Sequence, residues 1–257
     1  MAKKRTKPPF RADHVGSLLR PPELLEARDR NARGELSPEA LREIEDKHIR
    51  NVVKLQEDAG LESITDGEYR RAIFHIDFLK HLEGVAVEGS IATKFHKKDG
   101  NVDFAPPRLV VTGKLRHGHA IQVRDFEFLK SVTGRTPKVT IPSPTMVHFR
   151  GGREAIDKTA YPDLEEFFED LAECYRQEIA ALGRAGCRYL QLDDTNLAYL
   201  CDPEQRKAAQ ARGDDPDALT HRYARLINAA IADKPEDMVI CTHLCRGTFR
   251  SASQWLH

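Results

Sequence analysis

This sequence has no formal net charge, no long apolar stretch and no CxxC pair of cysteines. Its 40 Lys and Arg residues balance 40 Asp and Glu residues, so the 257-residue chain carries no formal net charge. Without excess positive charge, we expect neither nucleic acid nor an anionic membrane as the main partner. The apolar runs are too short for a transmembrane helix. The basic N-terminus, MAKKRTKPPFRADH, also lacks the apolar region of a secretory signal.

Cysteine usage and overall composition point to a folded cytoplasmic protein. The five cysteines are an odd number and include no CxxC pair, so reduced thiols in a cytoplasmic setting are expected. Hydrophobic residues make up 40% and charged residues 31%, a balance that excludes wholesale disorder. The length of 257 residues is close to the roughly 250 typical of one (β/α)8 barrel.

Strand and helix patterns alternate along most of the chain. Residues 1–9 are expected to be a mobile basic tail, followed by one domain over 10–257 with an excursion at about 85–106. Helices are predicted at 38–59, with Ser37 as N-cap, at 163–182 and at 216–232. Six strands are predicted, at 10–19, 61–66, 108–115, 138–144, 187–194 and 238–244. Strands that alternate with helices and end in polar residues favour a parallel α/β architecture.

Acidic residues stand at the ends of two predicted strands, where parallel α/β proteins collect functional groups. Glu68 follows the strand at 61–66, and Asp193 closes an otherwise apolar strand. Burial of Asp193 would be costly unless it bound something cationic. Asp66 and Asp194 are better explained as helix caps or salt-bridge partners. The pair Arg70-Arg71 is expected to be a solvated or paired surface.

The segment His14-Val15-Gly16-Ser17 closes the first predicted strand. Glycine there permits close approach of the backbone to a ligand, and Ser17 offers an amide and a hydroxyl. The segment lacks the glycine density and the lysine of a phosphate-binding P-loop.

Cys241, His243 and Cys245 alternate along the last predicted strand. Alternate side chains share one face of a strand, roughly 6.5–7 Å apart, so His243 and Cys245 could bind one metal ion where the strand ends. Imidazole and thiolate are common zinc ligands, but two ligands do not complete a zinc site. Packing within a buried strand is the alternative, and we favour it for Cys241.

Four segments, in order, carry a family resemblance: ADHVGSLLRP, ITDGEYRR, YLQLDDTN and ICTHLCRG. Together they resemble the barrel of cobalamin-independent methionine synthase, specifically the short bacterial and archaeal proteins similar to its carboxy-terminal catalytic domain. The resemblance extends over the chain from residue 10 onwards. It implies a (β/α)8 barrel with a catalytic zinc ion at its carboxyl face.

The resemblance also implies individual roles. His243 and Cys245 match the family's first two zinc ligands, and Glu68 and Asp193 match the acids that hold the amino group of homocysteine. Ser17 matches the serine that contacts the carboxylate of the amino acid. In the family, the zinc-bound thiolate attacks a methyl group on N5 of a folate.

One departure from the family pattern affects both the fold and the metal site. The family pattern continues for roughly a hundred residues past the His-x-Cys strand and supplies a glutamate and a second cysteine to the zinc. These ligands are expected beyond His257, which predicts a truncated chain and an incomplete barrel of about six strands. Open sheet edges of that kind could pair with another copy, so an oligomer is possible.

The leading hypothesis is a zinc-dependent methyltransferase that acts on the thiol of homocysteine and takes its methyl group from 5-methyltetrahydrofolate or a related donor. One alternative is zinc-dependent alkyl transfer to coenzyme M. This sulfonate has no amino group, so Glu68 and Asp193 would lose their purpose. A third hypothesis is an inactive, truncated barrel with only a binding role.

Overall fold

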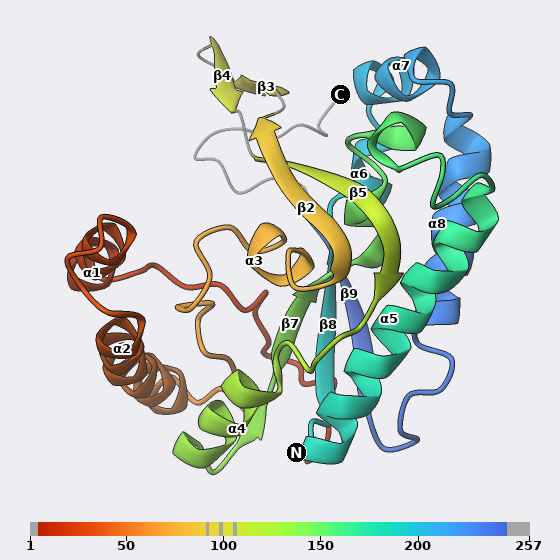
Figure 1. Cartoon of the computed structure of the whole chain (residues 1–257). Helices are drawn as coiled ribbons and strands as arrows, with labels where there is room; N and C mark the ends of the chain where they lie inside the picture. The colour runs from red at the N-terminus through yellow and green to blue at the C-terminus, as the bar shows by residue number, and fades with distance from the viewer. Residues whose placement is uncertain (1–4, 91–92, 98–99, 105–106, 246–257) are drawn as a thin grey trace.

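A computed structural model describes residues 5–90, 93–97, 100–104 and 107–245 (Figure 1). Its central feature is a parallel sheet in which β8 (Tyr189–Asp194) lies between β7 (Val139–Pro142) and β9 (Val239–Leu244). β1 (Ser63–Ile64) pairs in parallel with β6 (Thr136–Pro137), which leads into β7 through Lys138. The parallel strands therefore stand in the order β1, β6–β7, β8, β9.

The predicted strands at 61–66, 138–144, 187–194 and 238–244 are confirmed as members of these parallel pairs. The strand predicted at 108–115 exists as β5 (Pro107–Arg116), but its predicted parallel role is wrong because it pairs antiparallel with β2 (Glu83–Ser90). A β-branched run favours a strand without specifying its partner. In the described part of the chain, the strands do not close into a barrel.

The segment predicted as a strand at 10–19 contains no regular strand. Its backbone carbonyls accept hydrogen bonds from side chains instead of forming a ladder. Lys138 Nζ donates to the His14 carbonyl at 2.7 Å, and Gln191 Nε2 donates to the Val15 carbonyl at 2.7 Å. The loop is therefore fixed to the parallel sheet by side chains.

The predicted excursion at about 85–106 contains parts of two antiparallel strand pairs. One is β2 with β5, and the other is β3 (Thr93–Lys97) with β4 (Gly100–Phe104). Residues 91–92, 98–99 and 105–106 of the excursion lie outside the described residues, as do residues 1–4 of the predicted tail.

The long helices begin and end at recognisable capping residues. In α2 (Pro38–Asp58), the Ser37 side chain accepts a hydrogen bond from the Ala40 amide, as the sequence predicts. Asp163 caps α5 (Leu164–Ala185) in the same way, and Gly186 ends it with a left-handed backbone. The remaining helices are α1 (Pro22–Ala32), α3 (Ile76–Leu79), α4 (Val123–Val132), α6 (Asn196–Tyr199), α7 (Pro203–Ala211) and α8 (Pro216–Ala230), with 3-10 turns at Pro144–Val147 and Gly152–Ala155.

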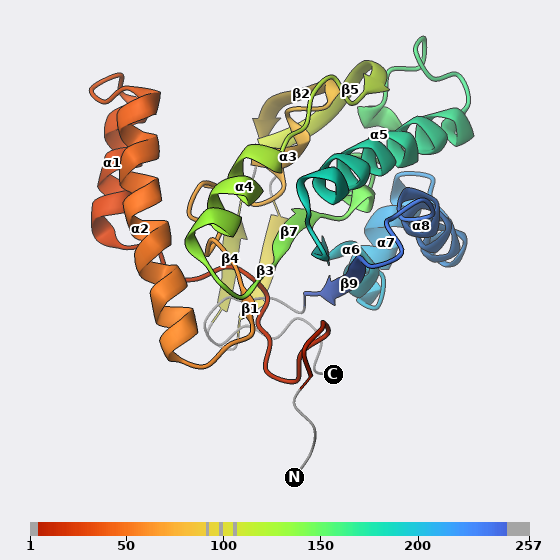
Figure 2. The same cartoon turned by 90° about the horizontal axis from the view of Figure 1, so that it is seen from below.

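Figure 2 shows α1 and α2 beside the β1 end of the parallel strands, and α5 and α8 toward the β9 end. Toward the β9 end, α5 packs against α8 and buries an apolar stripe at helical spacing, formed by Phe167, Leu171, Tyr175, Ile179 and Leu182. At the β1 end, α1 and α2 form a smaller core with β1, built on Leu24, Ile49, Val53, Ile64 and Tyr69. The N-terminal loop lies against the strand face that carries Tyr189 and Gln191. None of the helices in the described residues is long and apolar enough to cross a membrane.

Candidate active site

One cavity of about 670 Å³ lies at the carboxyl ends of β8 and β9, beside the N-terminal loop. It contains all five residues singled out from the sequence: Ser17, Glu68, Asp193, His243 and Cys245. The rest of its lining consists of Val15, Leu18, Leu19, Arg20, Leu25, Phe74 and Thr195. The cavity lining thus combines apolar side chains with two acids, an arginine, an imidazole and a thiol.

Glu68 enters the cavity from a tight turn that follows β1. It has a positive φ of 60°, a conformation that costs energy for a residue other than glycine and is often found at functional sites. The Asp66 carboxylate accepts a hydrogen bond from the Glu68 amide at 2.8 Å and so stabilises this turn; because no helix starts here, its predicted role as a helix cap is wrong. Thr140 Oγ1 donates to Glu68 Oε1 at 3.0 Å, and Arg71 Nη2 lies 3.5 Å from the same oxygen. The carboxylate is therefore held in place from two directions.

The N-terminal loop is fixed to this turn. Arg20 Nη2 donates to the carbonyls of Glu68 and Arg71, at 3.0 and 2.8 Å. The Leu18 amide also donates to the Gly67 carbonyl at 3.1 Å. These contacts hold the loop, and with it Ser17, against the cavity.

Gly16 packs closely against the sheet. Its φ is +113°, and a Cβ atom at this position would lie 2.5 Å from Thr140 Cγ2. The glycine is needed because the loop packs tightly against β7. This packing accounts for the glycine in the structure, and its predicted close approach to a ligand stays a prediction.

Asp193 lies one residue before the end of β8, and only 6% of its surface is exposed. Burial, and then the negative charge of Glu68, raise its pKa to about 7, against the opposing effects of Gln191, Arg71 and Lys138. Gln191 Nε2 donates to Asp193 Oδ1 at 2.6 Å. Two carboxylates in a buried cavity, one of them titrating near neutral pH, form a site suited to a cationic group.

The neighbouring Asp194 is a capping residue, as the sequence predicts. Its Oδ1 accepts hydrogen bonds from the amides of Asn196 and Leu197, at 2.8 and 2.9 Å. Its Oδ2 accepts a hydrogen bond from Thr145 Oγ1 at 2.8 Å. Asp194 therefore stabilises the start of α6 and does not line the cavity.

His243 and Cys245 lie at alternate positions at the end of β9, and both line the cavity. His243 stands opposite Asp193 in the strand register. Burial, and then the positive charge of Lys138, lower the pKa of His243, so its imidazole is neutral at physiological pH. A neutral imidazole and a thiol have the right chemistry for zinc.

The set of donors is nevertheless incomplete. Among the residues that the structure describes, no three His, Cys, Asp or Glu side chains are grouped so that they could hold one metal ion. A catalytic zinc ion takes three protein ligands plus an open position. The two donors fit part of a zinc site, and the described residues supply no third.

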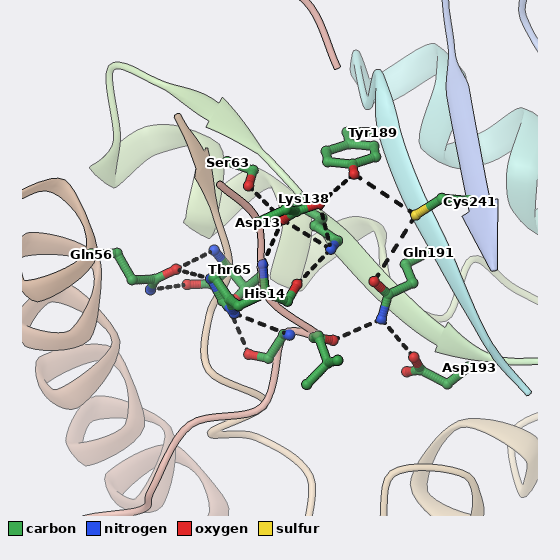
Figure 3. A network of polar contacts seen from close by, with 12 residues as sticks. Asp13, His14, Gln56, Ser63, Thr65, Lys138, Tyr189, Gln191, Asp193 and Cys241 are labelled. Atoms are coloured by element: carbon green, nitrogen blue, oxygen red, sulfur yellow. Dashed lines mark hydrogen bonds and ion pairs between the residues drawn. The ribbon is translucent and has the colours of Figure 1, made fainter. Parts of the chain in front are cut away.

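A partly buried polar network lies next to the cavity and connects the N-terminal loop to the sheet (Figure 3). Asp13 accepts hydrogen bonds from Ser63 Oγ at 2.7 Å and from the Tyr189 hydroxyl, and it pairs with Lys138 Nζ at 3.2 Å. Burial opposes ionisation of Asp13, but these partners outweigh it and lower the pKa of the carboxyl. Cys241 Sγ lies beside this network, 3.9 Å from the Tyr189 hydroxyl, and is absent from the cavity lining.

Sequence reasoning missed several residues that shape the cavity. Gln191 and Thr140 face the same interior as Asp193 and Glu68, so strand alternation could have pointed to them. Arg71 was expected at a solvated or paired surface. It is paired, but its side chain is 6% exposed. Arg20 gives no local signal, because its partners are 48 and 51 positions away in the sequence.

The fold and the cavity define a mixed α/β domain with a small-molecule site at the carboxyl ends of parallel strands. The family model described as "Cobalamin-independent synthase, Catalytic domain" matches residues 10–255. The chain therefore belongs to the cobalamin-independent synthase family, and the match is to its catalytic domain.

Individual relatives agree with this assignment. The uncharacterised protein YxjH of Bacillus subtilis (strain 168) is 45% identical over 253 residues, which cover 96% of this chain and 64% of YxjH. A solved structure from Listeria monocytogenes, provisionally assigned as a vitamin-B12-independent methionine synthase, has a TM-score of 0.77 and 41% identity, and the match covers 95% of this chain and 67% of that one.

A more distant relative carries the name of a reaction. The 5-methyltetrahydropteroyltriglutamate–homocysteine methyltransferase of Thermotoga maritima is 23% identical over 251 residues, covering 97% of this chain and 32% of that enzyme. The chain thus spans less than two thirds of YxjH and about a third of the Thermotoga enzyme.

Proposed function

We propose that the protein is a zinc-dependent methyltransferase that converts homocysteine to methionine. The observation that supports this most directly is the convergence of Ser17, Glu68, Asp193, His243 and Cys245 on one cavity. Membership of the cobalamin-independent synthase family supports the same reaction. The methyl donor in this proposal is 5-methyltetrahydrofolate or a related compound.

The two carboxylates would bind the ammonium group of the amino acid. Glu68 Oε1 is held by Thr140 and Arg71, and Asp193 Oδ1 is held by Gln191. Both carboxylates are therefore fixed in position before a ligand binds. An ammonium group would favour the ionised form of Asp193, whose pKa of about 7 leaves part of the population protonated at neutral pH. Ser17, on the facing loop, would donate to the carboxylate of the same amino acid.

His243 and Cys245 are proposed as two of the ligands of the metal ion. When bound, zinc would stabilise the homocysteine thiol as a thiolate at neutral pH, which supplies the nucleophile. The protein's own contribution is orientation: the acids and Ser17 fix the amino-acid end of the substrate, so that its sulfur points toward the end of β9. All five cysteines are free in the structure, in keeping with a cytoplasmic location.

Coenzyme M is a poorer fit to this cavity than homocysteine. It carries a sulfonate and no ammonium group, so nothing in it would neutralise Glu68 and Asp193, which are 5% and 6% exposed. With coenzyme M bound, Glu68 would keep only its pair with Arg71, and Asp193 would stay buried without a cation to favour its ionised form, which carries a desolvation cost.

A product assay tests the proposal. The chain is incubated with zinc, 5-methyltetrahydrofolate and either L-homocysteine or coenzyme M, and methylated product is measured by mass spectrometry. We expect methionine from homocysteine, a rate at least tenfold lower in Asp193→Asn, and an unchanged rate in Asp237→Asn, which alters an exposed acid. Methylation of coenzyme M in place of homocysteine would contradict the substrate. A folded, zinc-supplied chain that methylates neither would support a binding role alone.

A further inference from the structure

Arg20 is a positively charged residue in the wall of the cavity, whose lining also contains the acids Glu68 and Asp193. Among the described residues that line the cavity, it is the only Lys or Arg. It lies three positions after Ser17 on the same loop, directly before Pro21 and the start of α1. The cavity therefore has Ser17 and Arg20 on one loop and the acids Glu68 and Asp193 on other elements.

The guanidinium of Arg20 is fixed at one nitrogen and available at another. Nη2 donates to the Glu68 and Arg71 carbonyls, at 3.0 and 2.8 Å, which sets the position of the whole planar group. Nε is buried and has no partner. In the described part of the chain, Nη1 makes no hydrogen bond and is not among the buried atoms. Nη1 can therefore donate to a ligand without releasing the loop.

We propose that Arg20 binds the carboxylate of an α-amino-acid ligand, an inference that rests on the proposed function. An α-amino acid carries a cation and an anion on the same carbon atom. Glu68 and Asp193 suit the cation, and a positively charged donor makes a stronger hydrogen bond to the anion than a neutral donor does. Arg20 lines the same cavity and supplies that charge beside the hydroxyl of Ser17. It would make the cavity selective for amino acids over amines of the same length.

The competing explanation is that Arg20 only shapes the protein. Its bonds to two carbonyls help to hold Glu68 at a φ of 60°, so its loss could weaken any ligand that contacts Glu68. That explanation makes a different prediction, because a distorted Glu68 would affect ligands with and without a carboxylate equally.

Arg28 provides a matched control. Its Nη2 donates to the carbonyl of Tyr69, the residue after Glu68 in the same turn, and Arg28 does not line the cavity. Arg28→Gln therefore disturbs the same turn by loss of an arginine–carbonyl contact, with no effect on a carboxylate in the cavity.

The experiment measures the binding of two ligands by calorimetry. These are L-methionine and 3-(methylthio)propylamine, which is methionine without its carboxylate. Neither has a free thiol, so their comparison does not depend on zinc. The wild-type chain, Arg20→Gln, Arg20→Lys and Arg28→Gln are compared at one pH, after circular dichroism has shown that each is folded.

We expect the wild-type chain to bind methionine more tightly than the amine. In Arg20→Gln, methionine should bind more weakly by on the order of 10- to 100-fold, the effect of losing one hydrogen bond between charged groups, while the affinity for the amine stays nearly constant. Arg20→Lys keeps the charge but not the planar fork, so its preference for methionine should lie between the two. In Arg28→Gln the ratio of the two affinities should equal that of the wild type.

Equal weakening of both ligands in Arg20→Gln would overturn the proposal and leave Arg20 as a positioning residue, with the proposed function intact. Should Arg20→Gln fail to fold, Arg20→Lys decides: a wild-type preference for methionine in that variant would overturn the proposal. A wild-type chain that binds neither ligand would contradict the proposed function itself.

Discussion

The side-chain amide of Gln191 joins Asp193 to the N-terminal loop: Nε2 donates to Asp193 Oδ1 at 2.6 Å and to the Val15 carbonyl at 2.7 Å. A hydrogen bond to a carboxylate stabilises its ionised form. Gln191 therefore opposes the two effects that raise the pKa of Asp193 to about 7, burial first and the charge of Glu68 second. One amide thus controls both the charge of an acid in the cavity and the attachment of the loop.

Replacement of this amide should make Asp193 harder to ionise. In Gln191→Leu, the pKa of Asp193 should rise above its wild-type value of about 7, because the stabilising hydrogen bond is lost while burial remains. The measurement is a pH titration of the Asp193 carboxyl carbon by NMR in the metal-free chain. Gln177→Leu, in an exposed part of α5, is the control. A pKa that falls or stays constant in Gln191→Leu would contradict the expectation.

Glu68→Gln should change the same pKa in the opposite direction. Removal of the negative charge of Glu68 eliminates the second-largest cause of the raised value. The pKa of Asp193 should therefore fall below about 7, yet stay above the ordinary 3.8, because burial is the largest cause and persists. The same NMR titration measures it. A return to the ordinary value would show that the charge of Glu68, and not burial, dominates.

The local features of this fold can be predicted from sequence, but its longer-range pairings cannot. Ser37-Pro38 marks a helix start because capping depends on neighbouring residues, and this prediction is confirmed. The helix predicted at 163–182 is also present, with Asp163 as its cap. The β-branched run in β5 correctly predicts a strand, but its antiparallel partner β2 depends on a chain reversal that the run does not encode.

The same distinction holds for the cavity. Strand alternation identifies Asp193, because it places this acid on the same face as Tyr189 and Gln191, where burial of a carboxylate would be costly. Arg20 and Thr140 escape notice, because an arginine or a threonine in a loop or strand is ordinary until its partner is known. Their shared partner, the Glu68 turn, lies 48 residues from Arg20 and 72 from Thr140.

Lys138 should be far more important to stability than an exposed lysine with a similar ion pair. Its side chain is 1% exposed, pairs with Asp13 at 3.2 Å and donates to the His14 carbonyl at 2.7 Å. Lys138→Met removes the cation that bonds to the partly exposed Asp13 and to the His14 carbonyl, so the free energy of unfolding should fall by about 2 kcal/mol. The control is Lys158→Met, whose pair with Glu154 is exposed and should contribute less than about 1 kcal/mol. Urea unfolding measures both, and equal losses would argue against a structural role for the network.

Buried His148 should make the fold sensitive to acid. Burial, and then the charges of Arg222 and Arg212, lower its pKa from 6.5 to about 4. As the pH falls below 6.5, the unfolded chain takes up a proton at this position, while the folded chain resists until about pH 4. The contribution of neutral His148 to the free energy of unfolding is therefore fully present above pH 6.5. This contribution, on the order of 3 kcal/mol, is lost as the pH falls from 6.5 to about 4.

Urea unfolding at a series of pH values tests this expectation. His148→Asn should flatten the dependence between pH 6.5 and 4, and the exposed His221→Asn should not. The free energy of unfolding of His148→Asn should still depend somewhat on pH, because burial, and then the charge of Arg150, lower the pKa of His75 to about 3. A variant that keeps the full wild-type slope would exclude His148 as the source.

The metal proposal predicts which thiols affect zinc binding. His243→Ala and Cys245→Ser should each lower the affinity for zinc by more than about tenfold, because loss of a direct ligand should cost at least as much as loss of a residue that only orients one. Cys241→Ser should have little effect, because Cys241 lies beside Tyr189 and Gln191 and outside the cavity lining. The exposed Cys201→Ser controls for loss of a thiol elsewhere.

Competition with a chromophoric chelator at neutral pH measures these affinities without any methyl transfer. Because zinc binds the deprotonated forms of both ligands, the wild-type affinity should also fall as the pH is lowered. Wild-type affinity in both His243→Ala and Cys245→Ser would refute the assignment of the metal to the end of β9. Loss of affinity in Cys241→Ser as well would instead mean that the metal lies deeper along the strand, within reach of the network around Tyr189.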